Sequence, residues 1–331
     1  MTTSTIGRGL KGLAITPPLL GRISIGRVVE KDGKRLPEKD DQFTVTTQVQ
    51  DKDGWRLHPL DETLRQAAGG KLRNIPVRLL FNDPDLNLRS AYSMFDRKTA
   101  RPVCQGDGDQ CQRSTLEGLK LLPCPSPDLC DIGSQGHCKP YGRLNVLIGD
   151  DDATGTFIFR TTGFNSIRTL SARLAYFSAL SGGLLACMPL ELKLRGKSTA
   201  QSFGRPIYYV DLIVRTGLTL EQAVQQAREL DASRKANGFD QAALDEAARS
   251  GFARGVFEDG EDDGASVVEE FFPEITGSGA GTGCGADVGT GNGRHQDAAK
   301  ASEVRASNRH PTTTLRAKLG AASGQTNGVA P

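Results

Sequence analysis

Alternating apolar and polar residues mark several strands in the first two thirds of the chain. Phe43–Val49 alternates β-branched with polar residues, and Ile75–Phe81 is an apolar run of strand length. Pro189–Leu194 sets leucines against charged residues, and Arg205–Arg215 is rich in β-branched and aromatic residues. Each pattern is typical of a strand with at least one buried face.

Turn residues connect some of these strands. Gly21–Val49 is expected to form a strand, a charged loop over Glu30–Asp41 and a second strand. Arg143–Ile148 and Gly155–Thr161 are separated by a short acidic turn, which predicts a hairpin. Ala91–Phe95 adds a short strand after a turn with the sequence DPDLN.

A helical period replaces the strand period in three places. Apolar residues at helical spacing follow Asn165 or Ser166, either of which can cap a helix that ends at Gly182 and Gly183. Thr219 predicts the start of a second helix, which runs to about Asn237. A third helix is expected over roughly residues 240–253.

Together these elements predict an α+β fold with a mostly antiparallel sheet and a central helix. A cysteine-rich zinc module is inserted in the sheet, and helices follow it. The expected divisions are a flexible N-terminus (1–20), an α+β core (21–217) holding the zinc module (101–141), a helical segment (218–257), an acidic linker (258–274) and a disordered tail (275–331).

The composition changes sharply near the C-terminal end. Residues 258–274 are strongly acidic and contain no Lys or Arg, whereas the residues after Glu274 contain no aromatic side chain and repeat Gly, Ala, Ser and Thr. Such a segment buries too little apolar surface to offset the entropy of ordering it, so disorder is expected from about residue 276.

Charge and hydropathy narrow the class of protein. The formal net charge is +2, and because the linker is acidic the rest of the chain is moderately basic, which is compatible with a nucleic-acid partner. No apolar run reaches the roughly 18 residues of a membrane-spanning helix, and the N-terminus lacks the apolar core of a signal peptide. We therefore expect a cytoplasmic protein without a membrane partner.

Five of the seven cysteines fall between residues 104 and 138, spaced C-x6-C-x12-C-x5-C-x7-C. In a cytoplasmic chain such a cluster more often binds metal than forms disulfides, and structural zinc takes four such ligands. Ordinary buried thiols are the alternative. A structural site is favoured over a catalytic one, because the nearby His137 adjoins a cysteine and two neighbours seldom ligate one ion. The donors are Cys104, Cys111, Cys124, Cys130 and Cys138, of which one is spare.

A series of short motifs surrounds and follows these cysteines. They are Val103–Gly108, Pro123–Pro125 with Cys130, Gly142–Leu144 after Cys138, Gly155–Thr162, Asn165–Ile167 and Met188–Leu192. In this combination the chain resembles the recombination directionality factors of actinophages and related mobile elements. The resemblance extends from about Ile23 to Arg215, with a further short match at Glu269–Glu274. Proteins of that family partner large serine integrases and switch them from integration to excision.

The resemblance carries several expectations. It implies that Zn²⁺ is bound by Cys104, Cys124, Cys130 and Cys138, with Cys111 spare. It also implies a protein without catalytic chemistry of its own, whose partner is a serine integrase and which acts on DNA directly or through that partner. No small-molecule substrate is expected.

Two surfaces outside the cysteine cluster are candidates for binding. Arg160, Arg168 and Arg173 surround a turn that also carries phenylalanines, and they are predicted to contact nucleic-acid phosphates. Solvated strand and helix faces are the alternative. Phe271 and Phe272 lie in the acidic linker and are predicted to dock into a partner, the alternative being that they fold back onto the protein's own core.

The sequence therefore predicts a non-catalytic, zinc-binding accessory protein of DNA recombination in a phage or mobile element. A single-stranded-DNA-binding or annealing accessory is the alternative function, and a metal-dependent hydrolase is a minor one. No HExxH, GxSxG or P-loop motif supports a hydrolase.

Overall fold

The computed structural model gives the fold of most of the first 254 residues. For residues 27–31, 34–40, Gly54 and 252–254 it describes the backbone only. The described residues are 18–31, 34–51, 54–133, 137–150, 155–198 and 206–254, together with Phe271.

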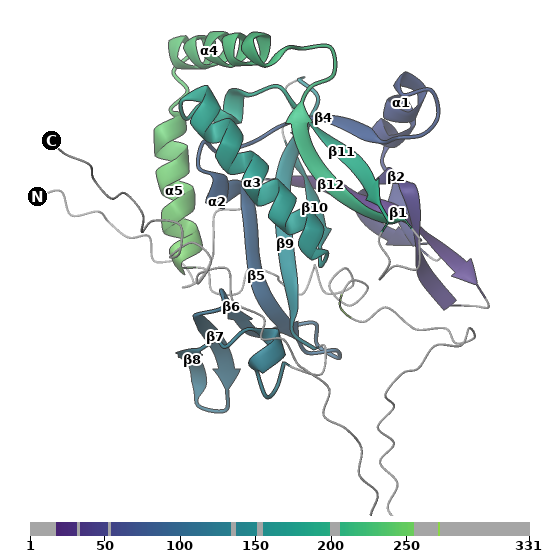
Figure 1. Ribbon diagram of the computed structural model, residues 1–331, viewed down its shortest axis with the longest axis vertical. Coiled ribbons are helices and arrows are strands. Elements are labelled where there is room, and N and C mark those ends of the chain that lie inside the picture. Colours follow the sequence, from purple (N-terminus) through teal and green to yellow (C-terminus); the bar gives the residue numbers. More distant parts are fainter. Residues whose placement is uncertain are drawn as a thin grey trace, which may run out of the picture. The chain divides into compact units, whose positions relative to one another are not determined.

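Twelve strands in these ranges form one connected sheet (Figure 1). Nine of them follow the order β3-β2-β1-β10-β9-β5-β6-β7-β8, and β4, β11 and β12 branch from β9 through β4. The strands are β1 (Leu19–Lys31), β2 (Lys34–Asp51), β3 (Gly54–Leu57), β4 (Asn74–Arg78), β5 (Leu88–Phe95), β6 (Pro102–Gly106), β7 (Gln110–Thr115), β8 (Gly118–Pro123), β9 (Lys139–Ile148), β10 (Thr156–Thr161), β11 (Leu190–Lys197) and β12 (Ile207–Val214).

Helices occupy the connections and the end of the described chain. They are α1 (Pro59–Ala67), α2 (Pro84–Asn87), α3 (Phe164–Ser181), α4 (Leu220–Ala236) and α5 (Gln241–Arg254), with short 3₁₀ turns η1 (Pro127–Leu129) and η2 (Leu185–Cys187).

The strand pairs in the described sheet are antiparallel with one exception. Strand β1 pairs with β2 antiparallel and with β10 parallel, from Leu19 opposite Thr156 to Ile23 opposite Phe159. The hairpin of β9 and β10 is antiparallel, as the sequence predicts. An α+β fold with a large, mostly antiparallel sheet is thereby confirmed.

Helix α3 covers the main core. Leu170 and Leu174 are fully buried with Phe157 and Phe159 of β10 and with leucines of β11. The helix ends where Gly182 takes a left-handed conformation (φ 69°), which glycine adopts without steric cost. Its N-cap is Gly163 rather than Asn165 or Ser166, because the Ser166 hydroxyl accepts from the amide of Val210 on β12 instead.

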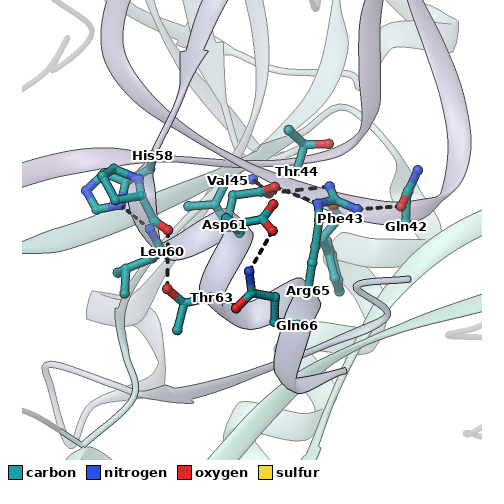
Figure 2. Close-up of polar contacts among 12 residues, drawn as sticks. Gln42, Phe43, Thr44, Val45, His58, Leu60, Asp61, Thr63, Arg65 and Gln66 are labelled. Atoms are coloured by element: carbon teal, nitrogen blue, oxygen red, sulfur yellow. Dashed lines mark hydrogen bonds and ion pairs between the residues drawn. The ribbon is translucent and has the colours of Figure 1, made fainter. Parts of the chain in front are cut away.

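A buried polar network attaches α1 to β2 (Figure 2). The carboxylate of Asp61, only 2% exposed, accepts from the amide of Val45 at 2.8 Å and from Nε of Arg65 at 2.6 Å. The same guanidinium donates to the carbonyl of Phe43 at 2.8 Å and to Oε1 of Gln42 at 2.5 Å. The Asp61–Arg65 ion pair of α1 thus also provides hydrogen-bond partners for polar groups of β2.

Two sequence expectations about connections are wrong. The charged segment Glu30–Asp41 continues the hairpin, with backbone pairing from Arg27 opposite Glu38 to Lys31 opposite Lys34. Ladder hydrogen bonds use the main chain, so charged side chains do not prevent them. The DPDLN segment contains a one-turn helix, α2, whose first turn Asp83 caps by accepting from the amide of Asp85.

Several expectations fall on residues outside those described. These are the flexible N-terminus before Pro18, the disordered tail 275–331 and the acidic linker 258–274 except Phe271.

Candidate metal centre and flanking surfaces

The cysteine segment extends the sheet as three short strands. Strand β6 pairs with the end of β5, β7 pairs with β6, and β8 pairs with β7 (Figure 1). The β6–β7 turn is built on Asp107, whose Oδ1 accepts from the amides of Asp109 and Gln110 at 2.8 Å each. These two donors hold the pKa of Asp107 below its usual value. We call residues 102–138, from β6 to Cys138, the cysteine module.

Each cysteine of the module lies within a short strand or directly beside a short element. The ladder places Gly106 of β6 opposite Cys111 of β7. Cys124 follows β8, and its amide donates to the carbonyl of Asp109 at 2.9 Å. All five cysteines carry free thiols, and their positions are Cys104 on β6, Cys111 on β7, Cys124 after β8, Cys130 after η1 and Cys138 before β9.

Two glycines let the thiols approach one another. A Cβ built on Gly106 would lie 2.8 Å from Sγ of Cys124 and 2.7 Å from Cβ of Cys111. A Cβ on Gly133 would lie 2.9 Å from Cβ of Cys138 and 3.5 Å from Sγ of Cys130. These positions leave no room for any larger residue.

The thiols of the module influence one another electrostatically. Burial first, and then the neighbouring thiols of Cys104, Cys124, Cys130 and Cys111, raise the pKa of the Cys138 thiol to about 12. The guanidinium of Arg113 lies against the same group, since Cys104 is the main cause of its raised pKa. Nearby thiolates repel one another, and a cation among them would remove that repulsion.

The donor set fits a structural zinc ion in chemistry and number. As placed, no three Cys, His, Asp or Glu side chains in the described ranges form a finished metal-binding group. The thiols are therefore adjacent but not arranged as a tetrahedron, and binding would require them to turn toward a common point. His137 is exposed, whereas the cysteines are buried or half-buried.

We expect Gly106→Ala to disturb this cluster. The added Cβ would stand within 3 Å of Cys111, Cys124 and the carbonyl of Gln110, so the two strands must separate. The expected results are a lower melting temperature and a lower metal content per chain, measured by calorimetry and by mass spectrometry. Gly118→Ala, in the β7–β8 turn, strains the backbone because Gly118 has a φ of 106°, so it should also lower the melting temperature. It should leave metal content at the wild-type value, however, because no atom lies within 4 Å of its Cβ.

The three arginines predicted to contact nucleic acid have different environments. Arg168 and Arg173 are exposed on α3. Arg160 is buried at 7% exposure on β10, a strand paired on both sides, so it is not part of an exposed cationic surface. The sequence places all three near one turn, but strand alternation directs only part of such a set outward.

Phe271 folds back onto the protein. Its ring is 2% exposed and packs edge to face against Phe95 and Tyr141, with centroids 4.6 and 5.2 Å away. Nζ of Lys139 donates to its carbonyl oxygen at 2.6 Å. For this residue the structure supports the alternative of folding back, while Phe272 lies outside the described residues.

The outer edge of the module is apolar, which the sequence analysis did not anticipate. Strand β8 pairs only with β7 among the described strands. Its side chains Leu119 and Leu121 are exposed, as are three apolar residues in adjacent turns. We define the leucine edge as Leu116, Leu119, Leu121, Leu129 and Ile132.

The amino-acid sequence of the sheet and the cysteine module matches a known family of recombination proteins. The family Gp3-like, described as recombination directionality factor-like, matches residues 20–215, a range that includes the whole cysteine module. The chain belongs to this family. Comparison with curated proteins and with solved structures gives no significant match.

No helix in the described part of the chain is long and apolar enough to span a membrane.

Proposed function

We propose that this protein is a zinc-stabilised, non-catalytic factor that binds a serine integrase of its own mobile element and promotes excision. The observation that carries the proposal is the family match over residues 20–215, which spans the sheet from β1 to β12 and the inserted module. A directionality factor requires surfaces for a recombinase, not groups that break bonds.

Zinc has a structural role in this proposal. Cys104, Cys124, Cys130 and Cys138 would hold the ion, and Cys111, which lies opposite Gly106 in the β6–β7 ladder, would remain a buried thiol. A tetrahedral Zn²⁺ bound to four thiolates supplies cross-links between elements that have little core of their own. Support comes from the proximity of the thiols and from the small number of side chains that strands β6 to β8 bury.

The leucine edge is the proposed binding surface for the integrase. Monomeric proteins seldom expose neighbouring apolar side chains on the edge strand of a sheet unless a partner covers them. The rigid sheet and the zinc would hold this edge in one shape. A partner can therefore add contacts along β8 with little loss of conformational entropy.

The double variant Leu119→Ser/Leu121→Ser tests this proposal. We expect it to weaken binding to the proposed partner, the serine integrase of the same mobile element, by roughly tenfold or more, because two central apolar anchors are lost. Excision between the two hybrid attachment sites should fall in parallel. Binding is measured by surface plasmon resonance without DNA, and excision by product formation on a plasmid substrate.

The matched control is Leu57→Ser on β3. Leu57 is similarly exposed but lies at the opposite edge of the sheet. Equal integrase affinity in the wild type and the double variant would reject the leucine edge as the binding surface. No integrase binding by the wild type, combined with tight binding to single-stranded oligonucleotides, would instead favour the annealing function.

A further inference from the structure

The charged side chains that three neighbouring elements, α3, β11 and β12, leave exposed or half-buried are all basic. The five bases are Arg168 and Arg173 on the helix and Lys193, Arg195 and Lys197 on β11. The two acids, Glu191 and Asp211, are 3% and 2% exposed. The outward face of these elements therefore carries positive charge without exposed carboxylates, together with uncharged side chains such as Phe164 and Tyr176.

The two acids are used inside the protein. Glu191 accepts from the amide and hydroxyl of Thr216 at 2.9 and 2.8 Å. Asp211 accepts from Nε of Arg173 at 3.0 Å through one oxygen and from Nε of Arg195 at 2.6 Å through the other. One buried carboxylate thus holds two guanidinium groups that come from different elements.

Each of these guanidinium groups is anchored to Asp211 through Nε, and neither contact uses an Nη group. The side chains of Arg173 and Arg195 are 47% and 42% exposed. No other hydrogen bond or ion pair engages either side chain within the described ranges. We call Arg173, Arg195 and Asp211 the arginine fork.

Further groups border the arginine fork on the same elements. Nζ of Lys197 donates to Oδ1 of Asn165 at 2.9 Å, which positions this ammonium at the start of α3. Arg168 is exposed, and Phe164, one helical turn earlier, is 56% exposed beside it. An exposed ring next to cations is typical of surfaces that contact the sugar and base edges of nucleic acid.

We propose that the arginine fork binds phosphate groups of the DNA backbone, with Arg168 and Lys197 contacting neighbouring phosphates. Planar guanidinium edges match phosphate oxygens in pairs, and a carboxylate that fixes two of them reduces the entropy lost on binding. Asp211 is a positioning residue for both arginines. The proposal rests on the proposed function in one respect: the choice of DNA, rather than another polyanion, as the ligand.

Duplex DNA suits this face better than an acidic segment of a protein. Five cations are spread over a helix and one strand without any exposed acid on these elements, which matches a repeating series of phosphates. An acidic protein surface carries mixed groups and would require basic and acidic residues in complementary positions. Binding of this kind is independent of base sequence and weakens steeply with salt.

The test compares full-length variants in binding a short fluorescein-labelled DNA duplex of arbitrary sequence, followed by anisotropy over a salt series. Arg173→Lys combined with Arg195→Lys keeps the net charge and still neutralises Asp211, so the fold is maintained. A lysine ammonium that pairs with Asp211 has no second planar edge with which to bind a phosphate group. We expect roughly tenfold weaker binding at unchanged salt dependence.

A second variant, Arg168→Gln, does not touch the arginine fork. We expect it to lower the slope of log affinity against log salt by about 0.9, the effect of one lost phosphate contact. Arg228→Gln on α4 is the matched control, because it removes an exposed arginine from a helix outside this face. That control should bind the duplex as the wild type does.

Three results would overturn the proposal. The wild type does not bind the duplex, or the double lysine variant binds it as tightly as the wild type does. The third is that the double variant loses affinity for the integrase in the absence of DNA while duplex binding is unchanged, which would make the ligand an acidic surface of the partner. Failure of the proposed function is separate, since it appears as loss of integrase binding with duplex binding intact.

Discussion

Replacing Cys124 by serine is expected to remove bound zinc and to unfold the cysteine module. A serine hydroxyl is not ionised at neutral pH and is a poor zinc ligand, so three thiolates remain where four are needed. We expect zinc to fall from about one ion per chain to almost none. Because metal binding and folding are coupled in small metal modules, the melting temperature should fall with it.

The measurement is metal content by mass spectrometry on protein purified without a histidine tag, beside a thermal melt. Cys130→Ser should give the same result, and Cys111→Ser a mild one. Cys187→Ser controls for the loss of a buried thiol, since Cys187 lies in the main core. Full zinc content in both the Cys124 and the Cys130 variants would show that these cysteines are not ligands.

Asp61→Ala is expected to lower the free energy of unfolding by about 3–5 kcal/mol. The substitution leaves the Val45 amide without its acceptor and removes the carboxylate that pairs with Arg65. A buried charge without its partner costs more than the pair contributes, because the remaining group stays desolvated. Urea denaturation of wild type and variant measures the difference.

Glu62→Ala is the matched control for this substitution. Glu62 lies on the same helix, but it is exposed and bonds only to the side chain of Gln66. Its removal should change the unfolding free energy by less than about 0.5 kcal/mol. If Asp61→Ala behaved like this control, the network of Figure 2 would have no structural importance.

Local signals in the sequence were sufficient for several elements. Thr219 caps α4 through a capping box with Gln222, and a box of this kind lies entirely within four consecutive residues. Gly182 ends α3 for a reason that is equally local, its positive φ. The β9–β10 hairpin follows from two apolar strands flanking an acidic turn.

Other elements depend on partners distant in sequence. Helix α1 is short and polar, and the sequence analysis did not identify it, although Pro59 at its first position and two acids in its first turn are helix-start signals. Its attachment depends on Asp61 meeting the amide of Val45. The strands of the cysteine module were also missed, because β8 exposes nearly all its side chains and lacks alternation.

The candidate sites also combine features that local sequence predicts with features that depend on residues distant in sequence. The cysteines cluster in the sequence, so the module could be located from spacing, but Gly106 is explained only by the close approach of Cys124. Asp211 is a single acid in an apolar strand, and a pattern of that kind does not by itself predict a binding site. Its role depends on Arg173 and Arg195, which lie 38 and 16 residues away.

The parallel pairing of β1 with β10 has a consequence for the kinetics of folding. Leu19 pairs with Thr156, so the centre of the sheet closes a very long loop of chain. Contacts at such separation slow folding, because the entropy of loop closure is lost before the pairing is gained. During synthesis the β1 edge of the β1–β2 hairpin therefore stays unpaired until β10 has left the ribosome. Refolding of the isolated protein should accordingly be slow and sensitive to protein concentration.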